Sequence, residues 1–229
     1  MDQGLDLGFQ AVGPTFLPVG GGDKINLVDI TIKGHEGECA DEIMVQSLTA
    51  DGDTVAGSMY VWYNFVDGAD VYYGWMNEGG DFVAREDGVE YDIAEGVWLS
   101  SASNELSYET SGEVDQAGSS YPLDFGFQLV CNTMPMDVNL VDIKVEGHDG
   151  ECADEIMIQS LTADGDTVAG SMYVWYNFID GTDVYYGWMN EGGDFVARED
   201  GITYKPGEGI WVSSASDELS VEIPGVEIK

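Results

Sequence analysis

The segment from Gly37 to Gly88 recurs almost unchanged as Gly150 to Gly201. The two copies differ only at Val45/Ile158, Val66/Ile179 and Ala69/Thr182. A shared fold requires only that the pattern of buried apolar positions be repeated, whereas here even turn sequences such as 49–53 and 78–81 are copied. This identity predicts an internal duplication of one structural unit. Either the duplication is recent or the surfaces of both copies have the same function.

The boundary between the two units is expected in the small, polar segment 111–120, whose composition is typical of a surface connection. We therefore predict one β-domain at residues 1–115 and a second at residues 119–229. Units of about 110 residues are large enough to bury a core of their own. Repeat 1 is slightly longer, most simply because of the glycines at 20–22.

The composition is strongly acidic, with 44 acidic and 7 basic residues and a formal net charge of −37. Such a surface repels nucleic acid and anionic membranes and attracts divalent cations and basic protein patches. No segment is long and apolar enough to cross a bilayer, and residues 1–5 lack a signal-peptide pattern. We expect no nucleic-acid partner and no membrane insertion. An extracellular or cell-surface location is favoured, and a cytoplasmic one stays open.

The three cysteines cannot all pair within one chain. Cys39 and Cys152 are equivalent by repeat, whereas Cys131 stands where repeat 1 has Gly13. A domain of this size needs no disulfide, so free thiols are favoured. A bridge between Cys131 and Cys152 is the alternative.

Apolar and polar residues alternate along much of the chain, as in strands with one buried face. In the segment 140–146, for example, Val141, Ile143 and Val145 alternate with charged residues. The strands predicted for repeat 2 are 125–131, 140–146, 155–161, 172–178, 184–189, 195–197, 210–213 and 219–223. With short turns and no helical spacing, this pattern predicts an all-β fold of two tandem homologous antiparallel β-sandwich or small-barrel domains.

Three segments of repeat 2, namely 126–135 (GFQLVCNTMP), 138–145 (VNLVDIKV) and 206–212 (PGEGIWV), resemble duplicated β-repeat proteins of gut anaerobic bacteria. The resemblance spans nearly all of repeat 2. It implies a repeated β-architecture in an exported or surface-associated protein, and it implies no chemistry. Repeat 1 departs from the pattern at residues 13–14 and 93–96.

The central strands carry large apolar residues on both faces, so both faces must be covered or used. If one aromatic face is exposed, it would bind sugar rings or form a protein interface. The alternative is that these side chains fill the core, which is the reading favoured for Trp98 and Trp211. The predicted ligand or interface aromatics are Tyr60, Trp62, Tyr73, Trp75, Tyr173, Trp175, Tyr186 and Trp188.

Two Asp-Gly-Asp turns, Asp51 to Asp53 and Asp164 to Asp166, offer the clustered carboxylates that calcium prefers. The spacing does not match an EF-hand loop, and Asp-Gly is a strong hairpin signal, so a tight turn is the favoured reading. Structural calcium at Asp51, Asp53, Asp164 and Asp166 is the alternative, and no other cofactor is predicted.

A second candidate metal loop contains His35 and Cys39, and it recurs with His148 and Cys152. Each copy has one imidazole and one thiol, without the paired ligands that make a zinc motif specific. A solvated acidic turn is the favoured reading.

No nucleophile elbow, phosphate-binding glycine loop or zinc-protease motif appears in the sequence, so the chain is not expected to be an enzyme. The favoured function is a structural or self-assembling surface protein, such as a filament, surface-layer or particle-decorating subunit. One alternative is a tandem carbohydrate-binding module that gains avidity on a polymeric surface ligand. Another is an acidic DNA mimic that occupies a basic groove.

Overall fold

The computed structural model describes residues 2–4, 8–13, 18, 22–34, 43–47, 55–93, 95–113, 118–147, 156–160 and 167–225, and these are the residues discussed below. The protein is all-β, as the alternation predicts. Within the described ranges the only helical segments are three-residue 3-10 turns, and none could span a membrane.

Among its described residues, the first half of the chain has ten strands and two 3-10 turns. They are β1 (Asp2–Gly4), β2 (Gly8–Val12), β3 (Lys24–Asn26), η1 (Leu27–Asp29), β4 (Thr31–Lys33), β5 (Ile43–Gln46), β6 (Tyr60–Asp67), β7 (Asp70–Asn77), η3 (Arg85–Asp87), β8 (Glu90–Asp92), β9 (Val97–Ser101) and β10 (Ser107–Glu109).

The second half supplies a matching set. It comprises β11 (Gly118–Pro122), β12 (Gly126–Cys131), β13 (Val138–Asn139), η4 (Leu140–Asp142), β14 (Lys144–Glu146), β15 (Ile156–Gln159), β16 (Tyr173–Asp180), β17 (Asp183–Asn190), η6 (Arg198–Asp200), β18 (Thr203–Tyr204), β19 (Gly209–Ser214) and β20 (Ser220–Pro224).

Each half forms a five-stranded, a three-stranded and a two-stranded antiparallel sheet. The five-stranded sheets have the orders β2-β9-β5-β6-β7 and β12-β19-β15-β16-β17. The three-stranded sheets are β1-β10-β4 and β11-β20-β14, and the two-stranded sheets are β3-β8 and β13-β18. No closed barrel is formed by the described strands, so the small-barrel alternative is not seen.

One hydrophobic core lies in each half, and it is shared by strands of different sheets. In the first half, Val45 and Leu99 of the five-stranded sheet belong to the same buried cluster as Ile32 and Tyr108 of the three-stranded sheet. The equivalent cluster of the second half contains Ile158, Val212, Val145 and Val221. The alternating strands therefore bury one face each against a facing sheet.

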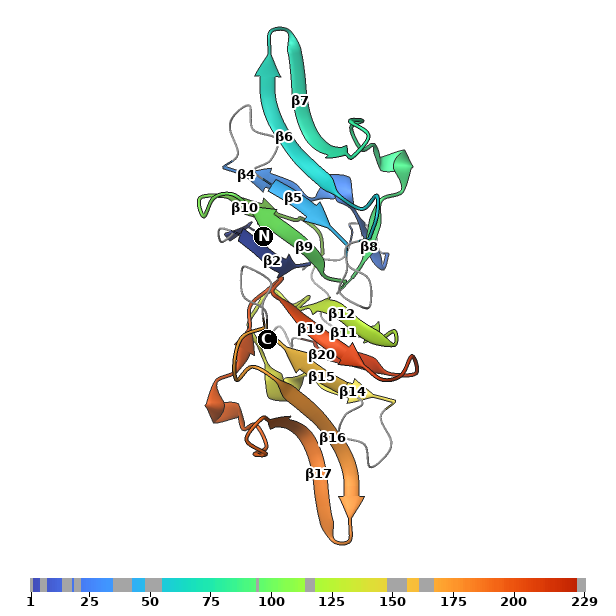
Figure 1. Cartoon of the computed structure of the whole chain (residues 1–229), viewed down its shortest axis with the longest axis vertical. Helices are drawn as coiled ribbons and strands as arrows, with labels where there is room; N and C mark the ends of the chain where they lie inside the picture. Colours follow the sequence, from blue (N-terminus) through green and yellow to red (C-terminus); the bar gives the residue numbers. More distant parts are fainter. Residues whose placement is uncertain are drawn as a thin grey trace.

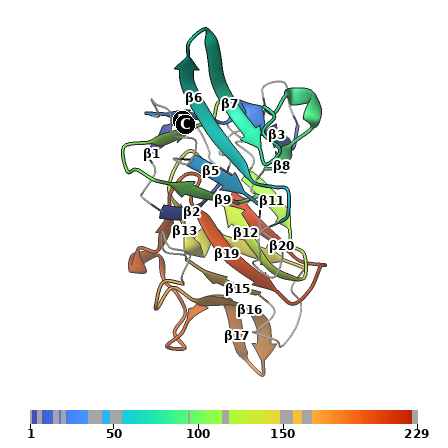
Figure 2. The same cartoon turned by 45° about the horizontal axis from the view of Figure 1, so that its top comes forward.

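The two halves meet along the edges of their five-stranded sheets, in the middle of an elongated molecule (Figures 1 and 2). Two antiparallel bridges cross the junction, Val12 with Glu208 and Val130 with Glu95. The N–H of Gly96 donates to the carbonyl of Leu129 at 3.0 Å. The long hairpins β6–β7 and β16–β17 consequently lie at opposite ends of the molecule.

Gly13 lies against Cys131 at this junction. A Cβ atom at Gly13 would lie 2.5 Å from the Cys131 Sγ, which is far closer than atoms can approach. The backbone carbonyl of Gly13 also accepts a hydrogen bond from the Tyr108 hydroxyl. Packing therefore explains why the two equivalent positions carry different residues. Cys131 fits at the junction because position 13 is a glycine.

Three predicted segments differ from the structure. The predicted strand 195–197 is not formed, because only Phe195 pairs there, in an isolated bridge with Met189. Residues 140–142 form the 3-10 turn η4 instead of a strand, because the Asn139 side chain accepts a hydrogen bond from the N–H of Val141 and caps a turn. The predicted surface connection 111–120 overlaps β11, since residues 118–120 pair with β20. Small and polar residues are compatible with a short edge strand, which composition alone does not distinguish from a linker.

A hydrogen bond distinguishes the two core tryptophans of each hairpin. The Trp75 Nε1 donates to the carbonyl of Ile30 at 2.8 Å, whereas the Trp62 Nε1 is buried without a partner. We expect Trp75→Phe to lower the free energy of unfolding more than Trp62→Phe, by about 1–3 kcal/mol, because it leaves a buried carbonyl unpaired. Urea denaturation followed by circular dichroism measures the difference.

Trp188→Phe and Trp175→Phe provide the matched pair in the other half, where the Trp188 Nε1 donates to Ile143 and Trp175 has no partner. An equal loss for both members of each pair would show that the indole hydrogen bond adds nothing to stability.

Candidate functional site

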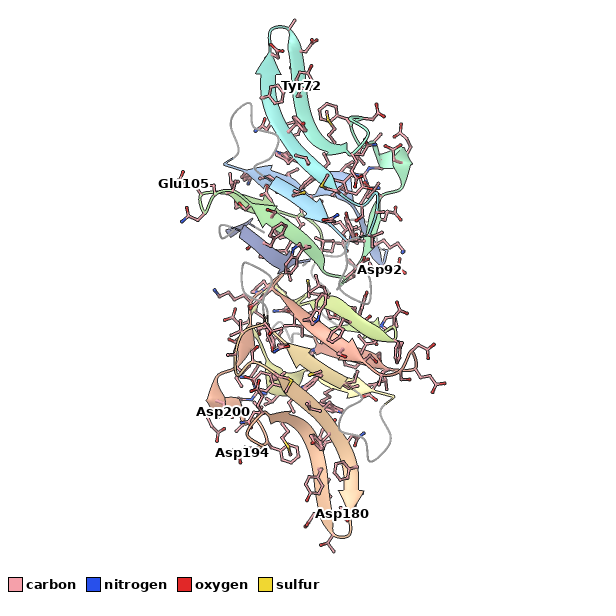
Figure 3. All side chains as sticks on the ribbon, in the orientation of Figure 1. Tyr72, Asp92, Glu105, Asp180, Asp194 and Asp200 are labelled. Atoms are coloured by element: carbon pink, nitrogen blue, oxygen red, sulfur yellow. The ribbon has the colours of Figure 1, made fainter. Side chains whose placement is uncertain are left out.

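The candidate site is the long hairpin that each half projects from the end of the molecule. Strands β6 and β7 pair along their whole length and are joined by Gly68 and Ala69. Gly68 has a φ of 62°, a left-handed conformation that glycine adopts at little cost in a tight turn. Figure 3 shows Tyr72 on one hairpin and Asp180 at the tip of the other.

The inner face of the hairpin is buried at its base. Trp62 and Trp75 are directly opposite each other, are each 1% exposed, and meet edge to face with ring centroids 5.2 Å apart. Trp175 and Trp188 are 1% and 2% exposed. The prediction that these four tryptophans form a ligand or interface surface is therefore wrong, because they fill the core beneath the hairpin.

Trp98 and Trp211 were expected in the core, and they are only half-buried. They lie on the outer face of the five-stranded sheets, where Trp98 stacks on Phe9 and Trp211 on Phe127 with centroids 5.9 and 5.7 Å apart. The burial of the tryptophans is thus the reverse of the prediction. Strand alternation alone does not say which face of a two-sided apolar strand meets the second sheet.

The inner face becomes bare toward the tip of the hairpin. Tyr73 contacts Trp62 and is 59% exposed, and the facing pair Val66 and Val71 is 65% and 71% exposed. Ile179, Val184 and Tyr186 are 67%, 69% and 52% exposed on the other hairpin. We call these two sets of three the tip faces. Of the predicted aromatics, Tyr73 and Tyr186 are exposed, whereas Tyr60 is half-buried and Tyr173 is buried, and a ligand or interface role for Tyr73 and Tyr186 stays a prediction.

The sequence interpretation did not single out Val66, Val71, Ile179 and Val184. Their position next to a predicted two-residue turn indicates exposure, since the tip of a long hairpin is the part farthest from any covering sheet.

The outer face of each hairpin carries an aromatic cluster. In the first half it consists of Tyr63, Phe65, Tyr72 and Phe82, with Phe65 and Tyr72 stacked at 4.6 Å and 9°. Gly74 pairs with Tyr63 and adopts a φ of 125°, and Phe82 lies over it. The equivalent cluster consists of Tyr176, Phe178, Tyr185 and Phe195. We call these the outer clusters.

The base of the hairpin is fastened to the body by the segment around η1. The Arg85 guanidinium pairs with the Asp29 carboxylate, and Trp75 donates to Ile30. Arg198 and Asp142 form the equivalent ion pair. The hairpins are therefore anchored at their base and uncovered by described residues at their tip.

The predicted calcium ligands Asp51, Asp53, Asp164 and Asp166 lie outside the described residues, as do the His35–Cys39 and His148–Cys152 loops. Among the residues that the structure does describe, no group of three or more His, Cys, Asp or Glu side chains is arranged to hold a metal ion. Calcium binding stays a prediction.

The junction between the halves contains two partly buried carboxylates. Burial raises the pKa of Glu95, while a hydrogen bond from the Asp92 N–H opposes the shift. Burial likewise raises the pKa of Glu208, which accepts a hydrogen bond from the Lys205 N–H. Each acid therefore costs more to ionise in the folded chain than in water.

Cys131 is a free thiol, fully buried at the same junction. Burial, followed by the nearby Glu95 and Glu208, raises the pKa of the thiol. A buried neutral thiol is a poor nucleophile, so Cys131 acts as a packing residue. The favoured prediction of a free thiol is confirmed for Cys131, and Cys39 and Cys152 lie outside the described residues.

No family model, curated protein or solved structure matches this chain. The resemblance to duplicated β-repeat proteins of gut anaerobic bacteria accordingly stays a prediction, and the function rests on the geometry described above.

The junction acids predict a pH dependence of stability. A raised carboxyl pKa favours the folded state below the unfolded value near 4.5, and this contribution is lost as pH rises through the folded pKa. We therefore expect Glu95→Gln with Glu208→Gln to raise the free energy of unfolding at pH 7, with a difference from wild type that shrinks toward pH 4. Denaturation at a series of pH values measures it.

The control is Glu86→Gln with Glu199→Gln, which removes the same two charges from exposed positions. An equal gain in both double variants would assign the effect to net charge and contradict the role of burial.

Proposed function

We propose that this chain is a non-enzymatic structural protein, built from two homologous β-sandwich units, that assembles end to end at a cell surface or outside the cell. The observation that carries the proposal is the presence of equivalent bare tip faces on the hairpins at opposite ends of the molecule. One chain thus offers two contact surfaces of the same kind. A filament or a surface layer requires at least this valency.

The sequence of the hairpins supports a shared task for the two ends. The strands of β6–β7 and β16–β17 are identical apart from Val66 and Ile179, and both of these side chains are apolar and about two-thirds exposed. Exposed apolar side chains gathered at one place are typical of contact surfaces. Conservation of the exposed apolar character in both copies favours a contact over an accident of packing.

The acidic surface gives the assembly a dependence on ions. Chains with a net charge of −37 repel one another, and the repulsion falls as salt or divalent cations screen it. As proposed, unassembled chains stay soluble until ionic conditions permit contact between the tips.

Light scattering across a concentration series tests the proposal. We expect the wild-type chain to grow beyond the 24.8 kDa monomer, more strongly with added salt or calcium. Val66→Ser with Val71→Ser should stop growth at a dimer, because one tip face is left. The same result is expected for Ile179→Ser with Val184→Ser, and a chain carrying all four substitutions should stay monomeric.

The two one-ended variants control for each other, and their circular dichroism should match that of the wild type because the replaced side chains are exposed. A wild-type chain that stays monomeric at every concentration and salt condition would contradict the proposal. So would large assemblies of the four-substitution variant.

The outer clusters favour a second candidate function, a tandem carbohydrate-binding module. Phe65 and Tyr72 present stacked, half-buried rings, and Phe82 beside them is 38% exposed. Aromatic faces are suitable platforms for sugar rings, and two equal sites on one chain gain avidity on a polysaccharide. The buried Trp62 and Trp175 no longer contribute to this candidate.

Affinity electrophoresis in polysaccharide-containing gels tests it. Tyr72→Ala in one half should lower the apparent affinity on the order of 10²-fold, because it removes avidity, and Tyr72→Ala with Tyr185→Ala should abolish retardation. Val66→Ser with Val71→Ser, on the opposite face of the same hairpin, should leave retardation unchanged. Absence of retardation of the wild type in every glycan tested would remove this candidate.

A further inference from the structure

The outer strands β7 and β17 are covered along only part of their edge. Residues 81–83 run beside the end of β7, where the N–H of Asn77 donates to Asp81 and the N–H of Val83 donates to Trp75. The equivalent bonds join Asn190 to Asp194 and Val196 to Trp188. No described residue pairs with the edge of β7 before Trp75, and the same holds for β17 before Trp188.

The direction of the free backbone groups follows from these bonds. Trp75 and Asn77 turn their peptide groups away from β6, toward residues 81–83. Peptide groups in an antiparallel strand alternate in direction with a period of two, so Val71 and Tyr73 also turn their N–H and C=O outward. Their side chains belong to the tip face. Unpaired backbone and bare apolar side chains therefore coincide at one short edge.

We infer that assembly proceeds by antiparallel pairing of this edge with the same edge of a second copy. The inference rests on the proposed end-to-end assembly and names its contact. A two-fold axis at Tyr72 would place Val71 of one chain opposite Tyr73 of the second copy. It would likewise place Tyr73 of the first chain opposite Val71 of the second copy. Both pairs would exchange backbone hydrogen bonds, and an aromatic and a β-branched side chain would meet on the tip face.

The edge is suited to a second copy of this chain because it is self-complementary. An isologous contact needs the same patch on both partners, and the 71–73 segment supplies donors, acceptors and apolar side chains symmetrically. The sequence of β17 from Asp183 to Asn190 is identical to that of β7. Either end can therefore pair with either end of the next chain.

The junction inside the chain also joins its halves by antiparallel bridges, each between the last part of an edge strand and a residue outside the named strands. Its two halves already meet through the edges of their five-stranded sheets, with antiparallel bridges on both sides of the contact. The strand order places β7 and β17 at the opposite edges of these sheets. Pairing of β7 with β7 or β17 of a neighbour would continue the sheets from chain to chain.

The length of the open edge limits the strength of each contact. Residues 81–83 and 194–196 cover the strand beyond Gly74 and Gly187, so pairing cannot extend far past Tyr73 and Tyr186. The exposed acids Asp67 and Asp70 flank the edge and oppose contact at low salt. Short pairing between like-charged tips predicts assembly that is reversible and dependent on concentration and salt.

Proline at the outward position tests the inference. Proline is tolerated on an edge strand where its missing N–H faces solvent, and it blocks pairing there. We expect Val71→Pro with Val184→Pro to remain a folded monomer by light scattering and circular dichroism. The matched control is Val71→Ala with Val184→Ala, which removes the same branched side chains and keeps the N–H groups. The protein concentration at which half of these alanine-variant chains are assembled should rise by less than about tenfold relative to the wild type.

A second measurement needs no variant. Hydrogen exchange of wild-type chains should show protection of the Val71, Tyr73, Val184 and Tyr186 amides in the assembled sample and fast exchange in the dilute one.

The outcomes separate the two proposals. Wild-type chains that never assemble would overturn the proposed function. Wild-type chains that assemble, together with proline variants that assemble as well as the alanine variants, or with amides that stay unprotected, would overturn edge pairing alone.

Discussion

The long hairpins of this molecule extend beyond the sheet that covers their base. A strand presents alternate residues on opposite faces, so a long hairpin with apolar residues on both faces needs cover along its whole length. The inner face has that cover at Trp62 and Trp75, and it loses the cover at Tyr73, Val66 and Val71. Full burial of such side chains contributes about 1.5–3 kcal/mol each, so a bare stripe in both halves favours a partner that covers it.

The junction between the halves explains where the two repeats differ and where they agree. The diverged segments meet there, and no side chain fits at Gly13 opposite Cys131, because a Cβ at Gly13 would lie 2.5 Å from the Cys131 Sγ. The nearly identical segments 37–88 and 150–201 include the hairpins, which lie at the far ends. Contact between the two halves thus requires complementary residues at the junction, whereas the ends can keep the same sequence on both hairpins.

The all-β class and most central strands follow from alternation and turn residues, as the match of 172–178 to β16 and 184–189 to β17 illustrates. The sequence does not separate the exposed Tyr73 and Tyr186 from the buried aromatics that were predicted with them. The sequence also does not predict which tryptophans are buried. Trp62 and Trp98 both lie on strands with apolar residues on two faces, and only the position of the second sheet decides which of them is buried. The 3-10 turn at η4 depends on an Asn139 cap within an apolar stretch that alternates like a strand. The open edge of β7 depends on where residues 81–83 lie, which periodicity does not encode.

Charge and edge pairing act over different ranges, and their combination determines when chains would join. Repulsion between chains of net charge −37 extends over roughly 8 Å at physiological ionic strength, whereas backbone pairing requires contact. An acidic surface therefore protects the open edges of β7 and β17 while chains are dilute or salt is low, a role that charged residues on edge strands often serve. Once ions screen the charge, no described residue pairs with the edge of β7 at Val71 and Tyr73. Under the proposed assembly, the acidic surface would delay the contact that the bare tip faces favour.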